Sequence, residues 1–157
     1  MTEGADFLII GGDVIGVSIA RELRRRYPDA GVCLIDKEPE CGQHASGRNS
    51  GVLHAGFYYT PDSLKARFTR EGNRALTAYC DERKLAINKC GKLVVARNER
   101  DLVALDELVR RGRDNGVELH EVSVADAHLL EPRAKTCQRA LFSPTTSSVN
   151  PTEVMRA

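Results

Sequence analysis

The order of apolar and polar positions is most regular in the first part of the chain. A continuous apolar run over residues 6–11 ends in glycines, and such a run is typical of a strand that a parallel sheet buries on both faces. Apolar residues at helical spacing follow from Val14 to Tyr27, and a second short run over residues 32–35 ends at Asp36. The pattern therefore predicts a β-α-β unit over residues 6–36.

Later segments repeat the helical spacing and carry helix-start signals. Apolar residues at positions 102, 105, 108 and 109 are expected to face inward from one of these helices. One predicted helix covers residues 61–83, with Thr60 as cap and Pro61 at the first position, and another covers 99–114, with Asn98 as cap. Ser123 caps a short predicted helix that stops before Pro132, and a last helix begins at Asn150 and Pro151.

Short apolar runs between these helices predict strands. They cover residues 87–96, as one strand or as a bent pair around Gly91, and residues 117–122 and 139–142. The last predicted helix has only a few residues before Ala157, and so short a helix is not stable by itself. We therefore expect the chain to be a piece of a longer protein.

The glycine-rich turn after the first strand predicts a dinucleotide site. Strand, tight turn and helix start follow in the order that places a pyrophosphate at the helix N-terminus. Gly11 and Gly16 match the G-x-G-x-x-G fingerprint, but Asp13 stands at its middle glycine. Asp36 lies where an acidic side chain accepts hydrogen bonds from an adenosine ribose and repels a 2′-phosphate, which argues against NADP. The alternative is a strand that simply ends in a solvated aspartate.

Asp13 weakens this prediction. A carboxylate about 5 Å from a phosphate charge costs roughly 3 kcal/mol at an effective dielectric of about 20, which is about a hundredfold in affinity. Aspartate tolerates left-handed backbone better than most residues, so we expect the turn itself to form.

Residues 41–56 are a second informative stretch. Glycines, serines, Asn49 and Arg48 lie together with few apolar residues before Val52. This composition predicts irregular backbone that can approach a planar ligand, with Arg48 offsetting phosphate charge. The alternative is a long, flexible surface loop.

Composition narrows the classes of function. A net charge of +1 gives no electrostatic case for binding nucleic acid or an anionic membrane surface. Five cysteines without a C-x-x-C pair, and an acidic rather than basic start, favour reduced thiols in a cytoplasmic protein without a signal peptide. Neither Cys nor His shows metal-ligand spacing, and no apolar run is long enough to span a membrane.

Several longer segments resemble one enzyme family. They are QHASGRNSGVLHAGFYY (43–59), PDSLKA (61–66), CGKLVVA (90–96), EPRAK (131–135) and LFSPTT (141–146). In order and spacing the chain resembles the N-terminal part of FAD-dependent oxidoreductases of the D-amino-acid oxidase superfamily, and within it the L-2-hydroxyglutarate dehydrogenase/oxidase group.

The resemblance implies an α/β fold with a Rossmann-type FAD/NAD(P)-binding βαβ core and part of an α+β substrate domain, in a truncated form. It implies part of an FAD domain over residues 1–80, a partial substrate domain over 81–150 and the start of an interrupted helix over 151–157. The implied cofactor is FAD, and the implied substrate is L-2-hydroxyglutarate or a similar small 2-hydroxy acid, oxidised to the 2-oxo acid by hydride transfer to flavin.

The resemblance also implies site residues. His54 is the candidate catalytic base, with Tyr58 and Tyr59 near the flavin ring and substrate; His44, His120 and His128 have no motif support and are expected at the surface. The implied cofactor-binding residues are Gly11, Gly12, Asp13, Val14, Ile15, Gly16, Asp36, Lys37, Ser46, Arg48, Asn49, Ser50, Gly51 and Val52.

Two alternatives stay open, and so does whether the chain by itself is an enzyme. One is a catalytically inactive, truncated Rossmann-like module that binds dinucleotide weakly or not at all and forms a homodimer through its unfinished sheet. The other is a small NAD-binding module, since Asp36 suits NAD as well as FAD. The segment 43–59 argues against the second.

Overall fold

The structure is a computed structural model that describes residues 4–157, so part of the acidic start of the chain lies outside the described residues. The chain divides into two compact units. Unit 1 consists of Met1–Gly51 together with Asn150–Ala157, and unit 2 consists of Val52–Val149. The predicted domain boundary after residue 80 differs from this division, because it would cut through one continuous helix of unit 2.

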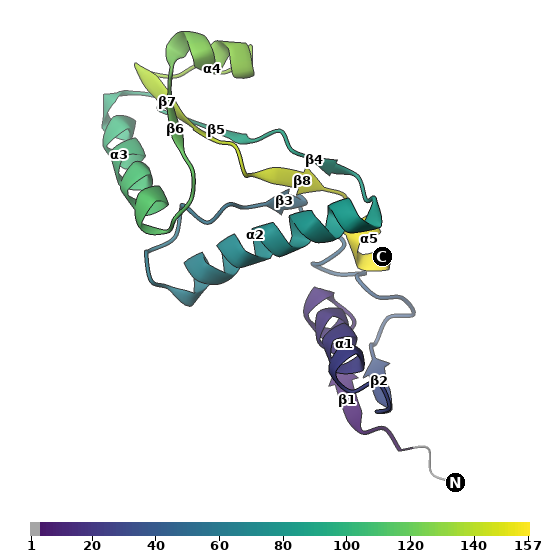
Figure 1. The fold of residues 1–157 in the computed structure, drawn as a ribbon. Helices are drawn as coiled ribbons and strands as arrows, with labels where there is room; N and C mark the ends of the chain where they lie inside the picture. Colours follow the sequence, from purple (N-terminus) through teal and green to yellow (C-terminus); the bar gives the residue numbers. More distant parts are fainter. Residues whose placement is uncertain (1–3) are drawn as a thin grey trace. The chain divides into compact units, whose positions relative to one another are not determined.

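Unit 1 contains the predicted β-α-β unit. Strand β1 (Phe7–Ile10) pairs in parallel with β2 (Val32–Ile35), and helix α1 (Val14–Arg26) connects them, as Figure 1 shows. The helix α5 (Pro151–Arg156), with Asn150 as its cap, completes this unit from the far end of the sequence. The Rossmann-type core predicted from the sequence is therefore confirmed.

The parallel pair is covered on one face only, within the described residues. Along both strands half-buried and exposed residues alternate, and Leu8 and Ile10 are 60% and 80% exposed. The expectation of a strand buried on both faces was thus wrong for this chain, because only α1 lies against the two strands. The apolar residues of the open face are left in contact with water.

Unit 2 contains two antiparallel three-stranded sheets and three helices. One sheet has the order β3-β8-β4 and the other has the order β5-β7-β6. The bounds are β3 (Val52–Leu53), α2 (Leu64–Arg83), β4 (Ile87–Asn88), β5 (Lys92–Val95), α3 (Glu99–Asp114), β6 (His120–Ser123), α4 (Val124–Leu130), β7 (Arg139–Ser143) and β8 (Ser147–Val149).

Helix α3 forms as its sequence predicts. The Asn98 side chain accepts hydrogen bonds from two backbone N–H groups of the first turn, at 3.0 and 3.3 Å. Leu105 is 2% exposed and joins Ala96 and Leu141 in a buried cluster, against which positions 102, 108 and 109 of the same helix are packed. Ser123 likewise caps α4, with a reciprocal capping box.

The start of α2 corrects a prediction. Thr60 and Pro61 were expected as the cap and first position, but the helix begins at Leu64 with Ser63 as its cap. Asp62 has a φ of +62°, which is left-handed backbone and cannot belong to a helix. The side chain of Ser63 then accepts a hydrogen bond from the N–H of Ala66 and satisfies one free donor of the first turn.

The strands show two further differences from the prediction. Strand β6 begins at His120 rather than Val117, which lies in the buried cluster of Ala55 and Phe57 without strand pairing. Residues 87–96 form a bent pair, since Gly91 with a φ of +70° separates β4 from β5. The short strands β3 and β8 were not predicted.

Candidate functional site

The glycine turn between β1 and α1 requires its glycines. Gly11 has a φ of +112°, and its N–H donates a 2.8 Å hydrogen bond to the carbonyl of Ile35 on β2. A Cβ at Gly16 would lie 1.9 Å from the carbonyl oxygen of Gly11, so no other residue fits without moving the backbone. Gly12 is buried, and a Cβ there would lie 3.1 Å from the sulfur of Cys41.

The N-terminus of α1 offers free donors. The N–H of Val14 donates a 3.0 Å hydrogen bond to the hydroxyl of Ser46. Within residues 4–157 the N–H groups of Ile15 and Gly16 have no protein acceptor, and the first helical hydrogen bond is that of Val17 to Asp13. Unpaired N–H groups at a helix start, together with the helix dipole, are suited to an anion.

Asp13 is the cap residue of α1, but its side chain does not cap the helix. Its φ of −82° and ψ of 178° are ordinary extended backbone, so the expected need for left-handed tolerance was wrong and no glycine is required at this position. Its Oδ1 atom is buried and has no hydrogen-bond partner. A negative charge therefore lies at the helix end that is otherwise suited to a phosphate.

Asp36 links the end of β2 to the glycine turn. Its Oδ2 accepts a 2.6 Å hydrogen bond from the N–H of Gly12, and its Oδ1 accepts one of 2.8 Å from the N–H of Glu38. The bond from Glu38 and then that from Gly12 lower the pKa of the Asp36 carboxyl, which is therefore ionised at neutral pH. Lys37, the next residue, is exposed.

The segment 41–51 folds onto this turn. The N–H of Gly42 donates a 3.0 Å hydrogen bond to the carbonyl of Gly12, in addition to the contact between Val14 and Ser46. A Cβ at Gly47 would lie 2.1 Å from the carbonyl oxygen of Gly42, so the segment repeats the tight five-residue spacing of the first turn. The structure thus brings together the glycine turn and residues 41–51 of the second stretch, whereas residues 52–56 belong to unit 2.

Polar residues of this segment have different surroundings. The side-chain amide of Asn49 donates to the carbonyls of Ala45 and Ser46 at 3.0 and 2.9 Å, and its oxygen accepts from the N–H of Gly51 at 2.8 Å. Asn49 therefore holds the shape of the segment. Arg48 is exposed, and no partner for its guanidinium exists within the described part of the chain; Ser50 is also exposed.

His54, Val52, Tyr58 and Tyr59 belong to unit 2, whereas the other predicted site residues belong to unit 1. His54 follows β3 and is exposed. Burial of part of its ring, and then the positive charge of Lys92, lower the pKa of His54, so the imidazole is neutral at pH 7. The ammonium of Lys92 also lies 4.7 Å from the ring centre of Tyr58. The remaining histidines are exposed, as expected.

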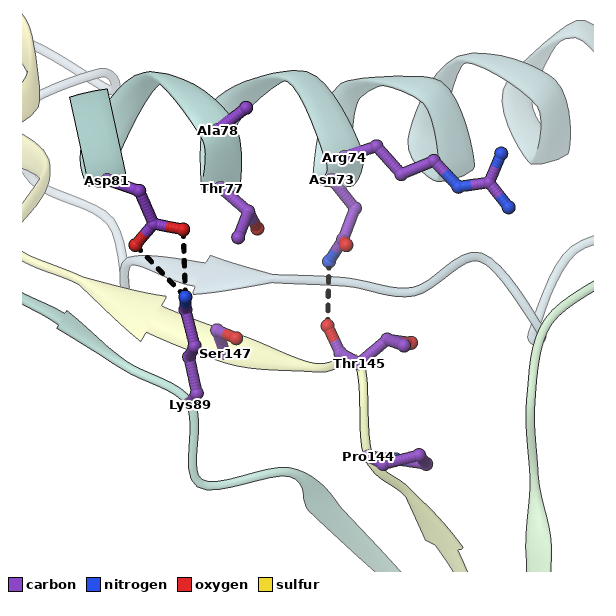
Figure 2. A pocket seen from close by; sticks show the side chains of 9 residues that line it. All are labelled: Asn73, Arg74, Thr77, Ala78, Asp81, Lys89, Pro144, Thr145 and Ser147. Carbon is purple, nitrogen blue, oxygen red and sulfur yellow. Dashed lines mark hydrogen bonds and ion pairs between the residues drawn. The ribbon is translucent and has the colours of Figure 1, made fainter.

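Unit 2 also contains a cavity that sequence reasoning missed. It has a volume of about 450 Å³ and lies between α2 and the strand ends below it, as Figure 2 shows. Asn73, Thr77 and Asp81 line it at a spacing of four residues. This polar stripe on a predicted helix could have indicated from the sequence that one face of the helix borders a polar cavity. The ammonium of Lys89 pairs with Asp81 at 2.8 Å on one side.

Among residues 4–157 no helix is both long and apolar enough to cross a membrane, and no cluster of three His, Cys, Asp or Glu side chains could hold a metal ion. All five cysteines are free thiols.

The residues of the turn fit a dinucleotide pyrophosphate in most respects. The N–H groups of Ile15 and Gly16 are free, the Gly16 position leaves the backbone open, and the ionised Asp36 lies beside the turn where a ribose hydroxyl is bound in such sites. Asp13 is the one group that does not fit, because its carboxylate repels phosphate.

Known proteins with similar sequences include several dehydrogenases. The chain is 39% identical to the mitochondrial L-2-hydroxyglutarate dehydrogenase of Nematostella vectensis, over 99% of this chain and 34% of that protein. It is 40% identical to the L-2-hydroxyglutarate dehydrogenase of Escherichia coli K12, over 97% of this chain and 36% of that protein. The chain thus spans about a third of the length of the curated relatives it matches.

Solved structures of two oxidases share the fold of this chain. The L-alpha-glycerophosphate oxidase of Mycoplasma pneumoniae, which was solved with FAD bound, matches 99% of this chain and 41% of its own, with a TM-score of 0.87 at 29% identity. Glycine oxidase from Geobacillus kaustophilus shares the fold, with a TM-score of 0.83 at 23% identity. Residues 6–157 match the family described as FAD dependent oxidoreductase. The chain therefore belongs to the family of FAD-dependent oxidoreductases.

Proposed function

We propose that this chain is the N-terminal, nucleotide-binding part of an FAD-dependent oxidoreductase that acts on L-2-hydroxyglutarate or a similar 2-hydroxy acid. The names of the relatives support the substrate class. One structural observation carries the proposal. The segment 41–51 is held against the N-terminus of α1 by the hydrogen bond between Val14 and Ser46, next to free N–H groups that suit a pyrophosphate.

Each group of site residues has a proposed role. The N–H groups of Ile15 and Gly16 hold the pyrophosphate, with Gly11 and Gly12 shaping the turn. Asp36 accepts hydrogen bonds from the adenosine ribose. The segment from Ser46 to Val52 runs along the flavin, with Arg48 as a free cation. FAD, when bound, supplies the acceptor for the hydride of the carbon that carries the substrate hydroxyl.

His54 is proposed as the base that accepts the hydroxyl proton. A general base has to be unprotonated at the working pH, and the lowered pKa of His54 keeps its imidazole neutral. Lys92, whose charge contributes to this shift, is proposed to attract the carboxylate of a 2-hydroxy acid to the same place.

The test is FAD binding by the purified chain. The proposal expects flavin absorption that stays with the protein through gel filtration, and loss of that absorption in Gly16→Ala. The matched control is Gly72→Ala, because a Cβ at Gly72 has no atom within 4 Å. A chain that is folded by circular dichroism and retains no FAD at all would overturn the proposal for this chain.

A second candidate function is a folded, inactive module that binds dinucleotide weakly or not at all. The buried, unpartnered Oδ1 of Asp13 at the start of α1 favours it. The exposed apolar residues Leu8 and Ile10 on the two-stranded sheet support self-association in this case. A molar mass by light scattering that is twice the chain mass, together with no FAD binding, would favour this candidate.

The location is proposed on thiol chemistry. All five cysteines are free and three of them, Cys33, Cys41 and Cys90, are exposed, which suits a reducing compartment such as the cytoplasm. Fluorescence imaging of the tagged chain in its own cell would check the location, and accumulation in an oxidising compartment would contradict it.

A further inference from the structure

A smaller cavity in unit 2 is lined by two arginines of α2. It has a volume of about 240 Å³, and Arg70, Arg74, Glu118 and Thr145 are among its lining residues. The two arginines are one helical turn apart, so their side chains leave the same face of the helix. The cavity lies wholly within unit 2 and does not depend on the flavin site.

Arg70 has one edge of its guanidinium occupied and one edge free. Its Nη1 donates a 2.6 Å hydrogen bond to the carbonyl of Asn115, at the end of α3. Its Nε is buried and has no hydrogen-bond partner. Nε and Nη2 together form the edge that binds a carboxylate with two parallel hydrogen bonds. A buried donor that has no partner is costly, so a ligand or water has to satisfy it.

Arg74 supplies a second positive charge. Figure 2 shows its side chain running along α2, away from Asp81 and Lys89. Arg74 and Arg70 both line the smaller cavity. Within residues 4–157 neither arginine forms an ion pair. The nearby carboxylates bind other residues instead: Glu71 pairs with Arg67 at 3.4 Å, Asp114 with Arg110 at 3.1 Å and Glu118 with His120 at 2.9 Å. An anion between the two arginines would relieve their mutual repulsion.

We propose that this cavity binds a carboxylate group of a small organic acid, through the free edge of Arg70 and the guanidinium of Arg74. Glu118 also lines the cavity, and its negative charge disfavours a phosphate, which concentrates up to two charges on one group, more than a carboxylate group, which carries one. A second cavity that Arg70 lines is unsuited to an anion, because Asp62 and Asp114 also line it.

The neighbouring 450 Å³ cavity provides room for the carbon skeleton of the acid. It shares Asn73, Arg74 and Thr145 with the smaller cavity, and it also has Ala78 and Pro144 in its lining. The amide of Asn73 is fixed between the two cavities by hydrogen bonds to the carbonyls of Leu53 and Thr145, at 3.0 and 3.1 Å. The second of these bonds is drawn in Figure 2.

The test follows the Nε–H signal of Arg70 by nitrogen-15 NMR of the whole chain. Glutarate is the probe, with inorganic phosphate and sodium chloride at matched ionic strength beside it. Glutarate is expected to shift this signal to saturation, and Arg74→Gln is expected to weaken the binding about tenfold, the usual size for loss of a charged hydrogen bond. Arg67→Gln on the same helix is the control and should leave the affinity unchanged, since Arg67 is not among the residues that line this cavity.

Three outcomes would overturn the proposal. They are an equal shift with sodium chloride, a response to phosphate alone, and the same glutarate affinity in Arg74→Gln as in the unaltered chain. Arg74 is exposed, so its replacement is not expected to unfold the chain, and circular dichroism checks this. Since FAD plays no part in the measurement, the result is independent of the flavin proposal.

Discussion

The carboxylate of Asp36 accepts a 2.6 Å hydrogen bond from the backbone N–H of Gly12, which lies 24 residues earlier in the chain. One side chain at the end of β2 thereby holds the turn that precedes α1. The same carboxylate is proposed to bind the ribose, so the shape of the turn and the affinity for the cofactor depend on one residue.

Replacing Asp36 is therefore expected to affect both the stability of the turn and the affinity for FAD. Asp36→Ala leaves the N–H groups of Gly12 and Glu38 without their acceptor and should lower the melting temperature and weaken FAD binding about tenfold. Because the pKa of Asp36 in the folded chain lies below its usual 3.8, its contribution to stability is complete above that pH and is lost as the pH falls through the lowered value. Thermal melts across acidic pH measure this, and a variant with the same pH dependence as the unaltered chain would contradict it.

Gly16→Ala and Gly72→Ala are expected to have opposite effects on stability. An added Cβ at Gly16 would lie 1.9 Å from the Gly11 carbonyl, so the turn has to move, at a cost of about 1–3 kcal/mol or more. At Gly72, inside α2, the Cβ meets nothing within 4 Å and alanine should stabilise the helix by about 1 kcal/mol. Urea unfolding of both variants checks this, and a neutral Gly16→Ala would show that the turn yields easily.

Removing the charge of Asp13 is expected to tighten FAD binding about tenfold or more. Its backbone is ordinary extended backbone, so both Asp13→Gly and Asp13→Asn should keep the turn. Asp29→Asn removes the same charge from an exposed turn and is the control. Fluorescence titration of FAD measures the affinity. If Asp13→Asn binds no better than Asp29→Asn, charge at the helix start does not limit the affinity.

The positive charge of Lys92 is expected to contribute to the lowered pKa of His54. Lys92→Met keeps most of the side-chain length but removes the charge, so the pKa of His54 should rise, while burial still holds it below the usual 6.5. In the unaltered chain the lowered pKa means that stability falls as the pH drops from 6.5 toward that value. Proton NMR of the His54 ring measures the pKa. Lys65→Met, which removes a lysine over the Tyr59 ring, should leave His54 unchanged.

Local signals were sufficient for the helices whose caps are unambiguous. Asn98 precedes both acidic residues and a regular apolar stripe, and α3 has the predicted bounds. Thr60 and Pro61 carry equally good start signals, but Asp62 adopts left-handed backbone and the chain has a second cap candidate in Ser63. Which of the two candidate caps starts the helix depends on the conformation of the preceding loop. No local sequence pattern contains that information.

Pairing over long sequence distances could not be predicted. The strands β3 and β8 have two and three residues, and Ser147 and Ser148 have no apolar periodicity. Only pairing with other strands therefore defines them. In the site, Ser46 and the glycine turn were both expected, but their hydrogen bond joins residues 32 positions apart. Asn49 was expected to face a ligand, and its amide is instead engaged by the backbone around it; whether it also touches flavin stays a prediction.

The contribution of α5 to unit 1 has a consequence for folding. The hydroxyl of Thr152 donates a 3.2 Å hydrogen bond to the carbonyl of Gly47, 105 residues earlier, and the side chain of Met155 lies against Gly42. Contacts between residues so far apart in sequence form slowly, since a long loop has to close first. During synthesis β1, α1 and β2 leave the ribosome well before Asn150 is added. Unit 1 therefore reaches its final structure only after all of unit 2 has been made, although β1, α1 and β2 precede unit 2 in the chain.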